Sequence, residues 1–77
     1  MNKARRKQIE SIMNRISEAK SDLEMVQDDE QSAFDNLTDS LQQTERGQQM
    51  EETISELADI VSNLEDIESG LNDILMK

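Results

Sequence analysis

The chain lacks cysteine, histidine, proline, tryptophan and tyrosine, and it has only two glycines and one aromatic residue, Phe34. Without cysteine there is neither a disulfide nor thiolate chemistry, and without histidine the commonest ligand of zinc and di-iron sites is missing. Strands favour aromatic and β-branched residues, whereas Glu, Gln, Leu, Ile, Ser and Asp dominate here. The composition therefore predicts an all-α protein.

A length of 77 residues allows one small domain, which we expect to span residues 1–77. One core of this size gives marginal stability, and since disulfides and metals are excluded, association is the remaining way to add to it. No run of 18 apolar residues is present, and the basic opening 1–7 is not followed by the apolar core of a signal peptide. We therefore expect a soluble cytoplasmic protein without a membrane partner.

Two heptad patterns predict two long helices. In the first half, apolar residues alternate three and four apart, with an interruption at Glu30, over Ile9, Ile12, Ile16, Ala19, Leu23, Val26, Ala33 and Leu37; Met13 and Phe34 flank this stripe. The second half repeats the pattern, with Glu68 at an expected apolar position, over Met50, Ile54, Leu57, Val61, Leu64, Leu71 and Leu75. Helices from about 3 to 36 and about 45 to 76 would form an antiparallel, coiled-coil-like hairpin.

The predicted turn covers about 37 to 44. Ser40 and Gln43 match a capping box, and Thr44 is placed to cap a helix that begins at Glu45. The pattern leaves open whether residues 39–43 form a helical turn or a plain loop. Gly47 costs about 1 kcal/mol relative to alanine within a helix, so the first turn is either loose or closely approached by a neighbour.

The distribution of charge supports the antiparallel arrangement. Most bases lie in residues 1–20, whereas residues 21–76 contain Arg46 as their one base, so the net charge of the chain is −10. A hairpin sets the basic start beside the acidic end of the second helix, which contains Glu65, Asp66, Glu68 and Asp73. Exposed ion pairs contribute about 0.2–1 kcal/mol each, so they select orientation more than they stabilise the fold.

A second apolar column on the second helix predicts self-association. Ile60, Ile67 and Ile74 lie seven apart beside the main stripe, together with Ala58, and the combined stripe is too wide for a two-helix contact. We expect a homodimer that forms a four-helix bundle through Ile54, Leu57, Ile60, Val61, Leu64, Ile67, Leu71 and Ile74. The alternative is that this column binds a different protein.

No motif predicts catalysis, a metal site or a cofactor, so we expect a non-enzymatic protein. Five carboxylates gather near the turn, at Asp28, Asp29, Glu30, Asp35 and Asp39, but they lack the EF-hand spacing. A solvated acidic face accounts for them better than a metal site. The basic run 5–7 has no aromatic neighbours for stacking and cannot outweigh the net charge, so we expect no direct nucleic acid binding.

Acidic helices can place carboxylates where a DNA-binding protein expects phosphates, so DNA mimicry is one hypothesis for a partner surface. Phe34, near the turn, is either a core residue or part of an interface. The candidate partner-binding residues are Asp28, Asp29, Glu30, Phe34, Asp35, Asp39, Glu45 and Glu52.

Four segments resemble a known group of proteins: 1–7, 28–31, 34–37 and 44–52. They resemble small, acidic, uncharacterised helical proteins of tailed phages and prophages of Gram-positive bacteria, although the group often has proline where Thr38 stands here. The resemblance implies stoichiometric binding and inhibition or sequestration of a host, defence or rival-element protein, such as a repressor, nuclease or replication factor. The alternative is a scaffolding accessory protein for phage assembly or recombination.

Overall fold

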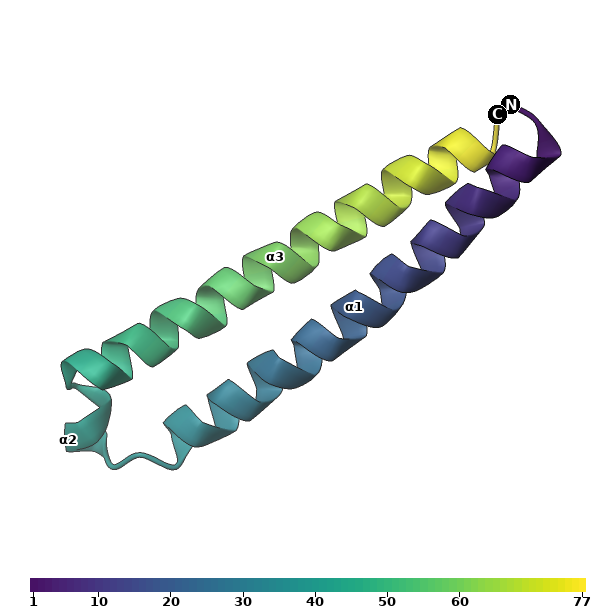
Figure 1. Ribbon diagram of the computed structural model, residues 1–77. Helices are drawn as coiled ribbons and strands as arrows, with labels where there is room; N and C mark the ends of the chain where they lie inside the picture. Colours follow the sequence, from purple (N-terminus) through teal and green to yellow (C-terminus); the bar gives the residue numbers. More distant parts are fainter.

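The computed structural model describes residues 1–77 as three helices and no strand: α1, Lys3–Asp35; α2, Asp39–Gln42; and α3, Glu45–Leu75. Helices α1 and α3 run antiparallel in contact, with both chain termini at one end and α2 at the other (Figure 1). The molecule measures 58 × 15 × 13 Å. The prediction of an all-α helical hairpin is confirmed. No helix carries an apolar stretch of the length that a membrane crossing requires.

Each helix begins at a polar side chain that accepts a backbone N–H. Asn2 Oδ1 accepts from Arg5 at 2.9 Å, Thr38 Oγ1 from Leu41 at 3.4 Å, and Thr44 Oγ1 from Gly47 at 3.2 Å. The N-cap predicted at Thr44 is therefore present, and residues 39–42 form a helical turn rather than a plain loop. The predicted capping box of Ser40 is absent, because Thr38 caps α2.

The two long helices meet along a seam. Along each helix, successive seam residues are three or four positions apart. On each helix, the residues that are not fully exposed are the seam residues: Arg6, Ile9, Met13, Ile16, Lys20, Leu23, Gln27, Glu30 and Phe34 on α1, and Gly47, Met50, Ile54, Leu57, Val61, Leu64, Glu68, Leu71 and Leu75 on α3. Only Phe34, Gly47 and Val61 are buried, so most of the seam remains half-buried.

The seam on α1 differs from the predicted stripe by one column. Ile12, Ala19, Val26 and Ala33 were expected in it, but all four are exposed, and Met13, Lys20, Gln27 and Phe34 take their place. Both columns adjoin the same central row, so the heptad pattern alone does not choose between them. Burial of the Phe34 ring against α3 turns the Ala33 column outward.

At the tip of the hairpin, the α2 backbone approaches the first turn of α3 closely. An added Cβ on Gly47 would lie 2.4 Å from the carbonyl oxygen of Gln42 and 2.8 Å from that of Leu41. Gln42 Nε2 also donates to the carbonyl oxygen of Phe34 at 3.1 Å. Gly47 is therefore needed for the close approach of the α2 backbone to the first turn of α3.

The open end is joined by a single arginine. The Arg6 guanidinium donates to the carbonyl oxygens of Leu75 and Lys77, where the orphan carbonyls and the dipole of α3 favour a cation. The basic start was expected to pair with the carboxylates of α3. One such pair forms, between Lys20 and Glu68, whereas Arg6 binds backbone carbonyl groups instead of a carboxylate.

Candidate interaction surfaces

Each long helix carries one row of residues on either side of the seam. Because α3 runs opposite to α1, the sense of its heptad is reversed, and corresponding rows of the two helices fall on the same side of the hairpin. One side, the apolar flank, consists of Ile12, Ala19, Val26 and Ala33 of α1 with Thr53, Ile60, Ile67 and Ile74 of α3. The opposite side, the polar flank, consists of Glu10, Ser17, Glu24 and Gln31 with Glu51, Ala58, Glu65 and Asn72.

The apolar flank exposes large side chains along most of the hairpin. Its four isoleucines and Val26 are between 38% and 52% exposed to solvent. A hollow of about 410 Å³ beside this flank is lined by Gln8, Ser11, Ile12 and Arg15 of α1. A row of large exposed apolar side chains along both helices marks this flank as a candidate interaction site.

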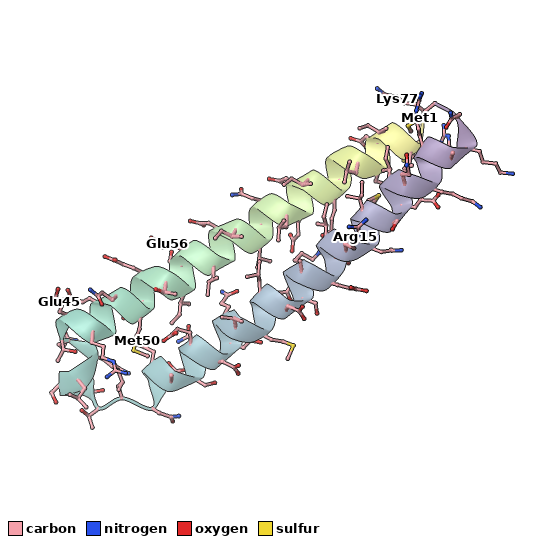
Figure 2. The ribbon with its side chains drawn as sticks, viewed as in Figure 1. Met1, Arg15, Glu45, Met50, Glu56 and Lys77 are labelled. Atoms are coloured by element: carbon pink, nitrogen blue, oxygen red, sulfur yellow. The ribbon has the colours of Figure 1, made fainter.

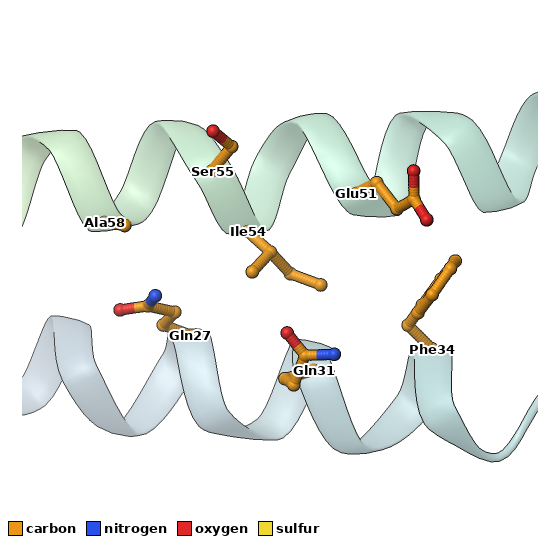
Figure 3. Close-up of a pocket in the computed structure, with 7 residues that line it drawn as sticks. All are labelled: Gln27, Gln31, Phe34, Glu51, Ile54, Ser55 and Ala58. Carbon is orange, nitrogen blue, oxygen red and sulfur yellow. The ribbon is translucent and has the colours of Figure 1, made fainter.

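The polar flank contains a second hollow, of about 260 Å³, close to the tip (Figure 3). Phe34 and Ile54 project into it from opposite helices, and Gln27, Gln31, Glu51, Ser55 and Ala58 complete its lining. The lining offers the carboxylate of Glu51, two amides and the hydroxyl of Ser55.

A line of five exposed carboxylates runs along α3, on the side that faces away from α1. Its members, the acidic ridge, are Glu45, Glu52, Asp59, Asp66 and Asp73. Figure 2 shows Glu45 and Glu56 on the outer side of α3, while Met50 points toward α1. A spacing of seven residues places successive ridge carboxylates about 10.5 Å apart, over about 42 Å in all.

Within the seam, Lys20 and Glu68 form an ion pair at a nitrogen–oxygen distance of 2.8 Å, and each side chain is 22% exposed. The hydrogen bond to Glu68 is the main reason that the pKa of Lys20 is raised above 10.5; the charges of Glu68, Glu65 and Glu24 add to it, and desolvation opposes it. The Oε1 atom of Glu68 is buried beside this ammonium. The pair ties the two helices together in one register.

The predicted partner-binding residues do not converge. Asp28, Asp29, Asp35, Asp39, Glu45 and Glu52 are exposed around the tip, on different sides of the helices, and no group of acidic residues is arranged to hold a metal ion. Glu30 is half-buried in the seam. Phe34 is 9% exposed, so its position corresponds to the core alternative, with one edge open to the hollow on the polar flank.

The predicted self-association residues divide into two groups. Ile54, Leu57, Val61, Leu64 and Leu71 lie in the seam and contact α1 within the chain, whereas Ile60, Ile67 and Ile74 are exposed on the apolar flank. Sequence reasoning did not place the exposed column of α1 beside these isoleucines. The available signal was the spacing of Met13, Lys20, Gln27 and Phe34, a column of sevens in which Lys20 carries the charge opposite to that of Glu68.

No family model, curated protein or solved structure matches this chain.

Proposed function

We propose that this chain is a non-enzymatic protein that works as a homodimer and binds a basic protein through its acidic ridge, thereby inhibiting or sequestering that protein. The single observation that carries the proposal is the straight, exposed line of carboxylates on α3. The resemblance to small phage proteins supports a stoichiometric binder, with a repressor, nuclease or replication factor as the kind of target.

The ridge offers a basic protein surface several carboxylates on one helix. Five negative charges lie on one rigid helix, and Glu56 and Glu65 add charge on either side of the line. Charges in such an array reinforce one another's potential over a basic surface, which raises the rate of association at low ionic strength. The seam of α3 faces α1, so the ridge is free to contact a partner.

The exposed area of the single hairpin supports a homodimer in the form of a four-helix bundle. A compact protein of 8.8 kDa is expected to expose about 4,800 Å², whereas this chain exposes 5808 Å². The excess of about 1,000 Å² is close to the roughly 800 Å² that each partner buries in a standard interface. A second hairpin of equal length supplies a two-helix surface that matches the apolar flank.

The test compares two variants from which equal charge has been removed. The ridge variant carries glutamine or asparagine at the five ridge positions, and the control carries the same kind of replacement at five acids outside the ridge and the apolar flank: Glu10, Glu18, Glu24, Asp28 and Glu51. The immobilised wild-type chain and both variants are exposed to bacterial lysate and to a panel of purified DNA-binding proteins. We expect the wild type and the control to retain a common protein at a fixed ratio, and the ridge variant to lose it.

Two further readouts sharpen this experiment. Binding through the ridge should fall steeply between about 50 and 200 mM salt, and duplex DNA should compete with the chain for its target. Equal retention by the two variants would refute the ridge as the binding surface, and retention of no protein above background would refute the binding function. Retention in extended assemblies of variable ratio would instead support the scaffolding alternative.

A further inference from the structure

We propose that two hairpins pack their apolar flanks together in antiparallel orientation, with the two-fold axis passing close to Ala19 and Ile67. This inference rests on the proposed homodimer and specifies the partner of the apolar flank, the residues that meet and the resulting position of the acidic ridges. Two observations support this dimer: the large solvent-exposed area of the single hairpin and the charges at the rim of the apolar flank.

The contacts between the helices fix which residues of the flank lie at the same level. Arg6 reaches the carbonyl group of Leu75, and Lys20 reaches Glu68. These two contacts limit how α1 and α3 can be aligned along the hairpin axis. In this alignment, Ala19 lies near the level of Ile67. By the same spacing, Ile12 lies near Ile74 and Val26 near Ile60. The large residues are thus distributed almost evenly about the Ala19–Ile67 level, as a two-fold axis there requires.

The rim of the apolar flank has charges of opposite sign in its two halves. Toward the termini it carries Arg5, Arg15 and Lys77, and toward the tip it carries the acids Asp22, Asp29 and Glu56 with the single base Arg46, all of them exposed. Although the whole chain has a net charge of −10, this rim is nearly balanced. A surface that is basic at one end and acidic at the other is complementary to a reversed copy of itself.

The antiparallel orientation brings opposite charges together. With the axis at the Ala19–Ile67 level, α1 packs on α1 of the second copy and α3 packs on its α3, so Arg15 meets Asp22 and Lys77 meets Glu56 across the interface. In the parallel orientation, α1 instead faces α3, which sets Asp29 beside Glu56 and leaves Arg15 beside Gly70. Arg46, the one base of the rim near the tip, extends past the end of the reversed copy.

This packing has a consequence for the acidic ridge. Because the two α3 helices become neighbours, their ridges lie on one broad face of the bundle, about 8–10 Å apart and running in opposite directions. The parallel packing would separate them onto opposite faces. The dimer thus presents ten ridge carboxylates to one partner surface, twice the number on a single hairpin.

The oligomeric state is measured first, by light scattering coupled to size-exclusion chromatography of the full chain. We expect twice the chain mass for the wild type, a monomer for Ile67→Glu, and a dimer for Ala58→Glu. Both variants have the same net charge on the same helix, and both positions are exposed, but Ala58 lies on the polar flank. A monomeric wild type would overturn the homodimer and this inference together, and a dimeric Ile67→Glu would overturn the apolar flank as the interface.

Cross-linking through introduced cysteines tests the relative orientation of the two hairpins. Because the chain has no native cysteine, any disulfide must join the introduced residues. Ala19→Cys should form an intermolecular disulfide on mild oxidation, because the two copies of residue 19 meet at the axis. Ala33→Cys should not, since its copies are about 42 Å apart in the antiparallel dimer. A dimer in which Ala19→Cys fails to cross-link, or Ala33→Cys cross-links equally, would overturn the antiparallel packing while leaving the homodimer intact.

A charge exchange provides an independent test of the rim. Arg15→Asp should raise the dissociation constant of the dimer about tenfold, because two attractive pairs become repulsive. Adding Asp22→Arg to the same chain restores both pairs and should restore the affinity. Circular dichroism checks that each variant keeps its helix content. An absence of rescue in a folded double variant would contradict the predicted pairing.

Discussion

The tip and the middle of the hairpin are packed to different degrees. At the tip, Phe34 and Gly47 are buried and the α2 backbone lies against the start of α3. In the middle, Val61 is the one buried residue, the seam includes the Lys20–Glu68 pair, and isoleucines remain exposed on one flank. The tip and the arms therefore differ in how much apolar surface the single chain covers, and the proposed second copy would cover the exposed flank of the arms.

Replacement of Phe34 by alanine should remove the buried ring at the tip and should lower the free energy of unfolding more than any other change considered below. Loss of a buried phenylalanine typically costs about 3–5 kcal/mol, and the open edge of this ring places Phe34→Ala near the lower limit. Urea unfolding followed by circular dichroism, at one protein concentration, measures the change. Met25→Ala, on the exposed back of α1, is the control and should leave stability nearly unchanged. Equal effects of the two variants would contradict tight packing at the tip.

The two glycines lie in the two parts of the hairpin compared above, one at the tip and one in an arm. Replacement by alanine should change the stability of the chain in opposite directions at these two positions. Gly47→Ala forces a Cβ against the α2 backbone and should destabilise the hairpin by about 1–3 kcal/mol. Gly70→Ala meets no atom within 4 Å and should stabilise α3 by about 1 kcal/mol through helix propensity. Thermal unfolding of both variants distinguishes the two outcomes. A gain in stability from Gly47→Ala would show that the turn shifts at little cost.

The Lys20–Glu68 pair lies in the middle of the hairpin. Its removal should have the smallest effect on the stability of the chain. Lys20→Met should destabilise the chain, because it leaves the buried Glu68 oxygen without its counter-charge, and the double variant Lys20→Met/Glu68→Leu should recover the loss. The pKa of Lys20 is raised in the folded state, so its stabilising contribution is complete below pH 10.5 and is lost as the pH rises through the raised value.

Unfolding measured at a series of pH values checks this assignment. The difference in stability between wild type and Lys20→Met should stay constant from pH 7 to about 9 and shrink above pH 10.5. A difference that already declined between pH 7 and 9 would contradict the raised pKa. A double variant no more stable than Lys20→Met would show that the cost comes from lost packing of the lysine chain.

The sequence determined the two long helices, the N-cap at Thr44, the position of the turn and the absence of strands, because these depend on local propensity and on the seven-residue period of apolar residues. It did not determine which column of α1 faces α3. Two apolar columns flank the same row, and they differ by a small rotation that leaves the period unchanged. Only the packed structure, in which the Phe34 ring and the Lys20–Glu68 pair lie between the helices, selected one column and left the other exposed beside Ile60, Ile67 and Ile74.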